Sequence, residues 1–551
     1  MSFKKGIPGR RGYRFTFVGL LISAGIFSAF FTVGMALSGS LLREYGIVAE
    51  VSALLFSVDF LFTLIFGTIA ILSYLYYSKD NEFFLSLPVS ANAILYSKLT
   101  VIYVEEALFS VIFTIPGAIA LAISAAQPAT FYIMALIGTV FVPFCAILIG
   151  ALISVPITFI AGFFRNRGAV TTILLLAIFA ILMTLYFVFI YSLQNITVDG
   201  EDSEAVIDAM YRLLQVAMYV IYPIYCLTRF GTLSGGFTDN VATSAVINLL
   251  IFMGTVIVLS LLLFPISMLF YKRTMLRQAE NASPSKVKAG EYVGSSTLSA
   301  LVKKEFRLLF RNASFAFQCL AGVVMAPLFG VLMFTVTGGM DEVMDQETMT
   351  IMYSVMWPVG SMIALMMLGA MNMTALTAVT REGKTFIYSK LMPVPYSVQL
   401  NAKRISALLP GIISAVLTTI VMTVSCAFVY NKVDILCAIT TLLMLIAAVF
   451  LSTEAYLLRD MKKPRLDWVT PRDAIKGNLS TILPTVIGML VSMAAGIINI
   501  LVSAITNVMY GNNFGVTFSS LLIALIFAAF TFLAHSRLVS SADRCYDRLS
   551  A

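Results

Sequence analysis

Twelve long apolar runs divide this chain, and they restrict its fold more than any other feature. Each run reaches about 20 residues or more, the length that an α-helix needs to cross the hydrocarbon core of a bilayer. Because 60% of the 551 residues are hydrophobic and 12% are charged, a water-soluble core could not bury this much apolar surface. We therefore predict an all-α integral membrane protein with about 12 transmembrane helices. The runs lie near 16–37, 52–77, 99–124, 130–162, 169–193, 241–270, 313–337, 351–379, 406–430, 435–458, 479–506 and 515–536.

The lysines and arginines test this topology independently. With the N-terminus in the cytoplasm, the cytoplasmic segments hold 32 of the 36 cationic residues, and Arg43, Arg212, Arg229 and Lys432 remain outside. Cations concentrate on the cytoplasmic loops of membrane proteins, so we expect both termini in the cytoplasm. The net charge of +8 then reflects a membrane face and needs no nucleic-acid partner.

Residues 213–230 are apolar enough to suggest a thirteenth span. If they crossed, the nine cations of 271–312 would lie outside, against the charge rule. The run is short and is interrupted by Pro223. We therefore expect 194–240 to be an external insertion that contains an amphipathic or re-entrant helix.

Two cytoplasmic segments, 78–98 and 381–403, look like copies of one element. An offset of 305 residues superimposes Pro88 on Pro393 and Lys98 on Lys403. A repeat at about half the chain length predicts two related halves that present this element to the same side of the membrane. We expect a first half at 1–270, a cytoplasmic linker at 271–297 and a second half at 298–551.

The second half should open with an amphipathic helix over 298–312. At 100° per residue, Lys303, Lys304, Arg307 and Arg311 share one face, and leucines and Phe306 lie opposite. Such a helix is expected to lie flat on the inner leaflet of the membrane.

Each copy of the repeated element carries charged and aromatic residues near its proline. Two such elements at equivalent positions favour docking onto a two-fold cytoplasmic partner over ordinary polar loops, and a gate hinge within the repeat is the alternative. The candidate docking residues are Asp80, Glu82, Phe83, Phe84, Pro88, Arg381, Glu382, Lys384 and Pro393.

A further cytoplasmic motif follows the tenth run. It reads Pro464-Arg465-Leu466-Asp467-Trp468 and continues to Lys476 and Asn478. Together with Tyr77-Ser78-Lys79-Asp80, Leu87-Pro88-Val89 and Arg381-Glu382-Gly383-Lys384, it resembles the long permease subunits of type-2 ATP-binding-cassette (ABC) exporters from Gram-positive bacteria. The resemblance spans most of the chain.

The resemblance implies a function and a partner. Segments 78–98 and 380–403 would be coupling helices seated on an ABC ATPase subunit, two copies per chain, in the bacterial cytoplasmic membrane. The chain itself would be a transport subunit without an ATPase site or a cofactor, with ATP and Mg on the partner. Gly383-Lys384-Thr385 looks like the end of a phosphate-binding loop, but Ala378 stands where its first glycine is required.

Asp59 is the deepest acid in the predicted spans. An ionised carboxylate at mid-membrane costs roughly 2.5–3.5 kcal/mol, so it should face protein or water. It could line a transport pathway, or it could form a packing hydrogen bond to Ser, Thr or Tyr.

Two other function classes are weighed against the exporter. An ion-coupled secondary transporter is also commonly built from six plus six helices, but it would need more intramembrane ion-binding groups than Asp59. An integral-membrane enzyme acting on lipid would need clustered catalytic side chains, and the chain has one His. We also expect no metal site.

Overall fold

In the residues that the computed structural model describes, all regular secondary structure is helical, in agreement with the predicted all-α class. In hydrocarbon the backbone must satisfy its own hydrogen bonds, and a helix does so within one segment. The described residues are 32–33, 35–76, 88–162, 167–194, 218, 221–234, 240–280, 296–335, 346–430, 433–468, 474, 479–510 and 514–548.

Within these ranges, nine helices are long and apolar enough to cross a membrane, or ten if one bent pair forms a single span. The nine correspond to nine of the predicted runs. Of the other three, 16–37 lies mostly outside the described residues, 169–193 includes the shorter apolar helix Ala169–Ile181, and 313–337 belongs to the bent pair.

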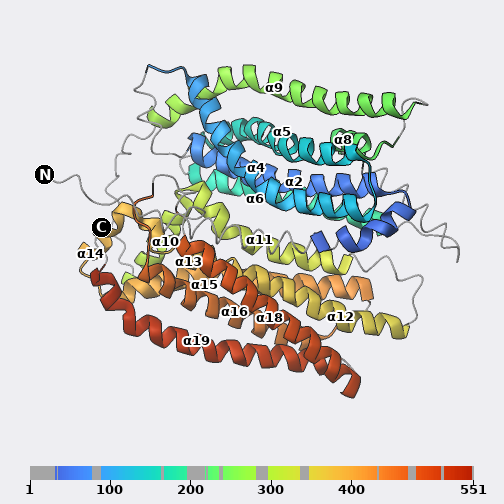
Figure 1. The fold of residues 1–551 in the computed structure, drawn as a ribbon. Helices are drawn as coiled ribbons and strands as arrows, with labels where there is room; N and C mark the ends of the chain where they lie inside the picture. Colours follow the sequence, from blue (N-terminus) through green and yellow to red (C-terminus); the bar gives the residue numbers. More distant parts are fainter. Residues whose placement is uncertain are drawn as a thin grey trace. The chain divides into compact units, whose positions relative to one another are not determined.

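The chain forms two compact units, each described here by itself. The first comprises Met1–Arg165 and Val198–Val287, and the second Asn166–Thr197 and Lys288–Ala551. The first unit contains α2 (Val48–Ile71), η1 (Leu72–Tyr76), α4 (Ala91–Ser124), α5 (Ala129–Gly162), α8 (Tyr222–Thr232) and α9 (Val241–Glu280) (Figure 1). The second contains α6 (Arg167–Gln194), α10 (Thr297–Phe310), α11 (Ala313–Thr335), α12 (Gln346–Leu365), η3 (Met366–Ala370), α13 (Met373–Leu376), η4 (Thr380–Thr385), α14 (Phe386–Leu391), α15 (Tyr396–Tyr430), α16 (Ile435–Lys462), α18 (Leu479–Tyr510) and α19 (Phe514–Arg548).

The position of α6 differs from a simple division into halves at 1–270 and 298–551. Although α6 precedes the middle of the chain, it packs against α11 of the second unit, and the Phe179 and Phe317 rings meet edge to face at 6.1 Å. Apolar runs along a sequence do not encode which runs pack together. The division into halves therefore stays a prediction about the repeat.

The repeated element has a structural counterpart in each unit. Helix α4 begins at Ala91 shortly after Pro88, and α15 begins at Tyr396 shortly after Pro393, again 305 residues apart. The Lys98 ammonium donates to the Tyr74 carbonyl at 2.8 Å, and the Lys403 ammonium donates to the Ala378 carbonyl at 3.0 Å. In both units a lysine on the later helix therefore holds the backbone of the preceding segment.

Helix α10 has the amphipathic character predicted for 298–312. Its axis turns by 97° relative to the following apolar helix Phe315–Gly330. Leu301 and Leu309 are buried, whereas Lys303 and Arg307 are exposed. This geometry fits a helix that lies along the membrane surface before the chain enters the bilayer.

Helix α8 lies in residues 213–232 and shows whether residues 213–230 form a further membrane span. It has 11 residues, too few to cross the hydrocarbon core, and it packs against α2, α5 and α9. The Tyr225 hydroxyl donates to Glu50 of α2 at 2.8 Å. In the described part of 213–230, the chain forms a short packed helix, and no thirteenth span is present there.

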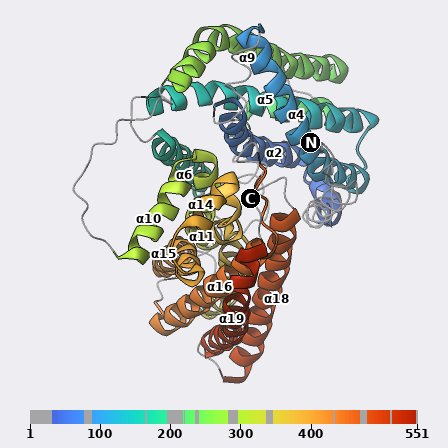
Figure 2. The same cartoon turned by 90° about the vertical axis from the view of Figure 1, so that its left-hand side faces the viewer.

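Helices α16, α18 and α19 lie side by side in the second unit (Figure 2). Cys437 and Thr517 lie 3.2 Å apart near the start of α16 and α19, and Glu454 and His535 lie 3.2 Å apart further along. The two helices are therefore parallel and in register. Helix α18 runs antiparallel to both. Hydrogen bonds Ser519–Asn499 and Gly515–Asn507 connect the start of α19 to the second half of α18.

Candidate functional site

The second copy of the repeated element is a turn of helix followed by a short helix. Thr380–Thr385 forms η4 and Phe386–Leu391 forms α14. Gly383 has φ 53°, a conformation that side chains with a Cβ rarely adopt. A Cβ there would also lie 2.9 Å from Nε1 of Trp468. The sharp turn in Arg-Glu-Gly-Lys therefore depends on glycine for two separate reasons.

A buried network of charges supports this turn. The Lys403 ammonium of α15 lies 2.8 Å from Glu305 of α10 and 2.5 Å from Glu382. Lys304 reaches Glu382 at 3.0 Å, and Arg381 lies 3.7 Å from Glu305. Except for Lys304, these side chains are almost completely buried. Buried charges are tolerated when they are paired and hydrogen-bonded, so these five residues fix α10, η4 and α15 to one another.

Asp460, near the end of α16, holds the backbone of the same turn. Its carboxylate accepts hydrogen bonds from the Val379 amide at 2.6 Å, the Thr380 amide at 3.1 Å and the Thr380 hydroxyl at 2.5 Å. A third buried carboxylate thus supports the turn, through its backbone and the Thr380 hydroxyl. It connects the turn to a second transmembrane helix.

Trp468 of the cytoplasmic motif closes the turn from the other side. Its indole N–H donates to the Thr380 carbonyl at 2.7 Å, and its ring packs edge-on against Phe315 with centroids 5.4 Å apart. The motif that follows α16 and the Arg-Glu-Gly-Lys turn, more than 80 residues apart, are therefore parts of one structure.

The outer face of the element is exposed and largely apolar. Tyr388 is 66% exposed, Leu391 73% and Ile387 46%. Lys384 and Pro393 are also exposed. The distribution of cations predicts that this element lies outside the bilayer, and an apolar surface there is typical of a protein–protein contact. Charge and burial thus give this element a fixed inner side and an available outer side.

The structure separates the predicted docking residues into groups. Lys384, Pro393 and Pro88 are exposed, as a contact role requires. Arg381 is 2% exposed and Glu382 4% exposed. The expectation that these two side chains contact a partner directly needs correction, because their charges are neutralised inside the chain. Asp80, Glu82, Phe83 and Phe84 lie outside the described residues.

The residues of the cytoplasmic motif also differ in their burial. Trp468 is buried at the turn, Pro464 is half-buried, and Arg465 lies 3.5 Å from the exposed Asp467. The Arg465 amide also donates to the Thr380 hydroxyl at 3.2 Å. Lys476 and Asn478 lie outside the described residues.

Asp59 is buried in α2, with 1% of its surface exposed. The Ser110 hydroxyl of α4 donates to one of its carboxylate oxygens at 2.6 Å, which is the packing hydrogen bond considered from the sequence. Among the described residues, its second oxygen has no hydrogen-bond partner. The carboxyl group therefore ties α2 to α4 with one oxygen.

Several residues of this site are not predicted by the sequence. Neither Glu305 nor Asp460 is among the predicted site residues, whereas Lys403 is predicted as the repeat partner of Lys98. Another buried acid, Glu454 of α16, pairs with Arg404 of α15 and lies 3.2 Å from His535 of α19. Charged residues at helix ends near the inner face were a usable signal, but the sequence does not reveal which of them are paired.

The described part of the chain contains no group of three or more His, Cys, Asp or Glu side chains that could hold a metal ion. The contacts of the network are ion pairs and hydrogen bonds to the backbone of the turn.

A family model described as "Membrane protein of 12 TMs" matches residues 15–534. No curated protein and no solved structure matched the chain.

Proposed function

Because the chain belongs to the family of membrane proteins with 12 transmembrane segments, we propose that it is the membrane-spanning permease subunit of an ATP-driven ABC exporter. The segment 380–403 would dock onto a separate ABC ATPase subunit, and 78–98 would dock onto a second copy. ATP and Mg would be bound by the ATPase subunits. The membrane would be the bacterial cytoplasmic membrane, and this chain would have no ATPase site of its own.

The observation that supports this proposal best is the two-sided construction of the second element. Its outer face presents Ile387, Tyr388 and Leu391 to solvent, while its inner side is fixed by buried ion pairs. A loop that only connects two helices needs neither feature. A segment that transmits force from a partner needs both an apolar contact and a rigid attachment.

The rigid attachment leads directly to transmembrane helices. Lys403 connects the turn to α15, and Asp460 connects it to α16. When a partner moves the element, these contacts would transmit the displacement to both helices. This is how two states of the ATPase could bias two states of the membrane path.

The test is co-purification and ATP-driven activity of a variant that alters only the outer face. Tyr388→Glu with Leu391→Glu should abolish recovery of an ATPase subunit with the tagged chain, because two charges would enter an apolar contact. Ser540→Glu, an exposed position on α19, is the matched control and should retain the partner. Mass spectrometry of wild-type complexes from native membranes identifies the partner and its copy number. Recovery of the chain alone from native membranes would refute the proposal.

The alternative is an ion-coupled secondary transporter, and it is favoured by the buried oxygen of Asp59 that has no hydrogen-bond partner among the described residues. The two functions differ in their energy source. Transport by the purified chain in vesicles with a proton or sodium gradient and no ATPase, abolished by Asp59→Asn, would support the alternative. Transport that requires ATP and an ATPase subunit, and that survives Asp59→Asn, would exclude it.

A further inference from the structure

We propose that a groove between α16, α18 and α19 binds one membrane phospholipid with an anionic headgroup. Its acyl chains would lie along the apolar walls, and its phosphate would lie at Arg459 and Arg537. This site is separate from the ATPase-docking element and does not depend on the proposed transport function.

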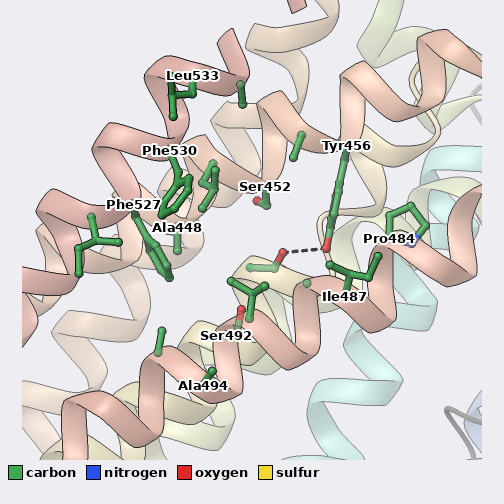
Figure 3. Close-up of a pocket in the computed structure, with 18 of the residues that line it drawn as sticks. Ala448, Ser452, Tyr456, Pro484, Ile487, Ser492, Ala494, Phe527, Phe530 and Leu533 are labelled. Carbon is green, nitrogen blue, oxygen red and sulfur yellow. Dashed lines mark hydrogen bonds between the residues drawn. The ribbon is translucent and has the colours of Figure 1, made fainter. Parts of the chain in front are cut away.

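The groove has a volume of about 840 Å3, in the upper part of the range of roughly 300–1,000 Å3 for small-molecule sites. Figure 3 shows Phe527, Phe530 and Leu533 of α19 on one side and Ile487 of α18 on the other. Hydroxyl groups are few along the walls. A lining of this kind suits a hydrocarbon chain.

Two arginines line the same end of the groove. Arg459 lies near the end of α16 and Arg537 in the last third of α19. These helices are parallel and in register, as the Glu454–His535 contact shows, so the two arginines lie at one level. Nε of Arg459 is buried and has no hydrogen-bond partner among the described residues. Also among the described residues, no carboxylate forms an ion pair with Arg459 or Arg537.

The surroundings favour a lipid as the occupant. Ile487, Val491 and Leu533 line the groove and are 52%, 46% and 54% exposed, so the groove opens sideways between membrane-spanning helices. A bilayer surrounds such helices, and its acyl chains are the apolar molecules available there. By the distribution of cations, the arginine end is cytoplasmic. The cytoplasmic leaflet carries the anionic headgroups that arginine attracts.

The experiment measures lipid binding directly. The purified full-length chain is delipidated in mild detergent and titrated with phosphatidylglycerol or phosphatidylcholine of identical acyl chains, and bound lipid is counted by native mass spectrometry. The wild-type chain should bind one phosphatidylglycerol in preference to phosphatidylcholine. Arg459→Gln and Arg537→Gln should each weaken phosphatidylglycerol binding about fivefold, which corresponds to roughly 1 kcal/mol per cation.

Matched variants separate the site from general effects. Arg544→Gln removes a cation from α19 outside the groove and should leave binding unchanged. Ala494→Trp places a large side chain in the groove at an exposed position and should reduce binding of both lipids. Leu490→Trp, exposed on α18 but outside the groove, is its control.

Equal wild-type affinity for the two lipids would overturn the proposal, as would Arg459→Gln and Arg537→Gln chains that bind like Arg544→Gln. If the arginine variants do not fold, the wild-type lipid preference and the Ala494→Trp and Leu490→Trp pair decide the question. Equal binding by those two tryptophan variants would also overturn it.

Discussion

Lys403 shows how much a single buried side chain can determine. Its ammonium contacts Glu305, Glu382 and the Ala378 carbonyl, so its three donors have partners from α10, η4 and the segment before it. A buried ion pair contributes little net stability, because desolvation opposes the attraction between the charges. Removing Lys403, however, leaves two buried carboxylates with fewer partners, since Glu382 keeps Lys304 at 3.0 Å and Glu305 keeps Arg381 at 3.7 Å.

Lys403→Met should therefore destabilise the chain by about 3–5 kcal/mol. A denaturant titration of the purified chain in detergent measures this loss in the free energy of unfolding. Lys303→Met is the control, because Lys303 is exposed on α10. Equal stability of the two variants would show that the network is not maintained in the folded protein.

Gly383→Ala should cost about 1 kcal/mol or more, since alanine is strained at positive φ and its Cβ would displace Trp468. In a Trp357→Phe background, Trp468 is the one remaining tryptophan, and its fluorescence should shift to the red as the ring leaves its buried position. Gly254→Ala is the control, because a Cβ there meets nothing within 4 Å. An unshifted spectrum would contradict the steric argument.

At this scale, the sequence predicts which residues matter better than how they act. Arg381 and Glu382 stood out by motif, yet their charges point inward. Spacing cannot distinguish a surface charge from a buried pair, because Arg381 pairs with Glu305 and Glu382 pairs with Lys304, each more than 70 residues away. The lysine repeat was the better signal, since Lys98 and Lys403 both hold a carbonyl of the preceding segment.

Among the elements, the break at the end of α12 is the one that needs the most support. The π-helical turn η3 leaves carbonyls of Gly369 and Ala370 outside the regular helical pattern, and the Tyr456 hydroxyl of α16 lies 3.1 and 3.2 Å from them. Gly488 of α18 accommodates this hydroxyl, because a Cβ at Gly488 would lie 2.0 Å from it. Three elements thus meet at one hydrogen-bonded point.

Tyr456→Phe should destabilise the second unit by roughly 1–3 kcal/mol, because a buried acceptor loses its donor while the packing of the ring is retained. The same denaturant titration applies. Tyr388→Phe, which removes a hydroxyl from an exposed ring on α14, should change nothing. A matching loss in both variants would show that the effect does not come from the contact of the Tyr456 hydroxyl with η3.

The sequence predicted helical elements well, because the length and hydropathy of each run follow from the thickness of the bilayer. It did not predict the break at η3. A π-helical turn depends on a distant hydroxyl and a distant glycine, and neither leaves a local pattern in residues 366–370. The amphipathic helix at 298–312 was predictable for the opposite reason, since its periodicity is local.

For the whole molecule, the distribution of cations predicts the orientation in the membrane. Five of the six cysteines are buried, so replacing Cys545 leaves little background for labelling with thiol reagents. Lys384→Cys should then react with a membrane-impermeant maleimide in inverted vesicles, and Val433→Cys in intact cells. Both positions are exposed in the structure. Reaction of the two variants from the same side of the membrane would refute the topology.

The assignment of α6 to the second unit also has a consequence for synthesis. Helix α6 ends at Gln194, and its partner α11 begins at Ala313. At 5–20 residues per second, the ribosome needs roughly 6–24 s to produce the chain between them. During that interval α6 is in the membrane without the helix that covers Phe179. In the nascent chain, α6 therefore lies in the bilayer before its packing partner α11 is synthesised. The second unit then assembles around a helix that was synthesised much earlier.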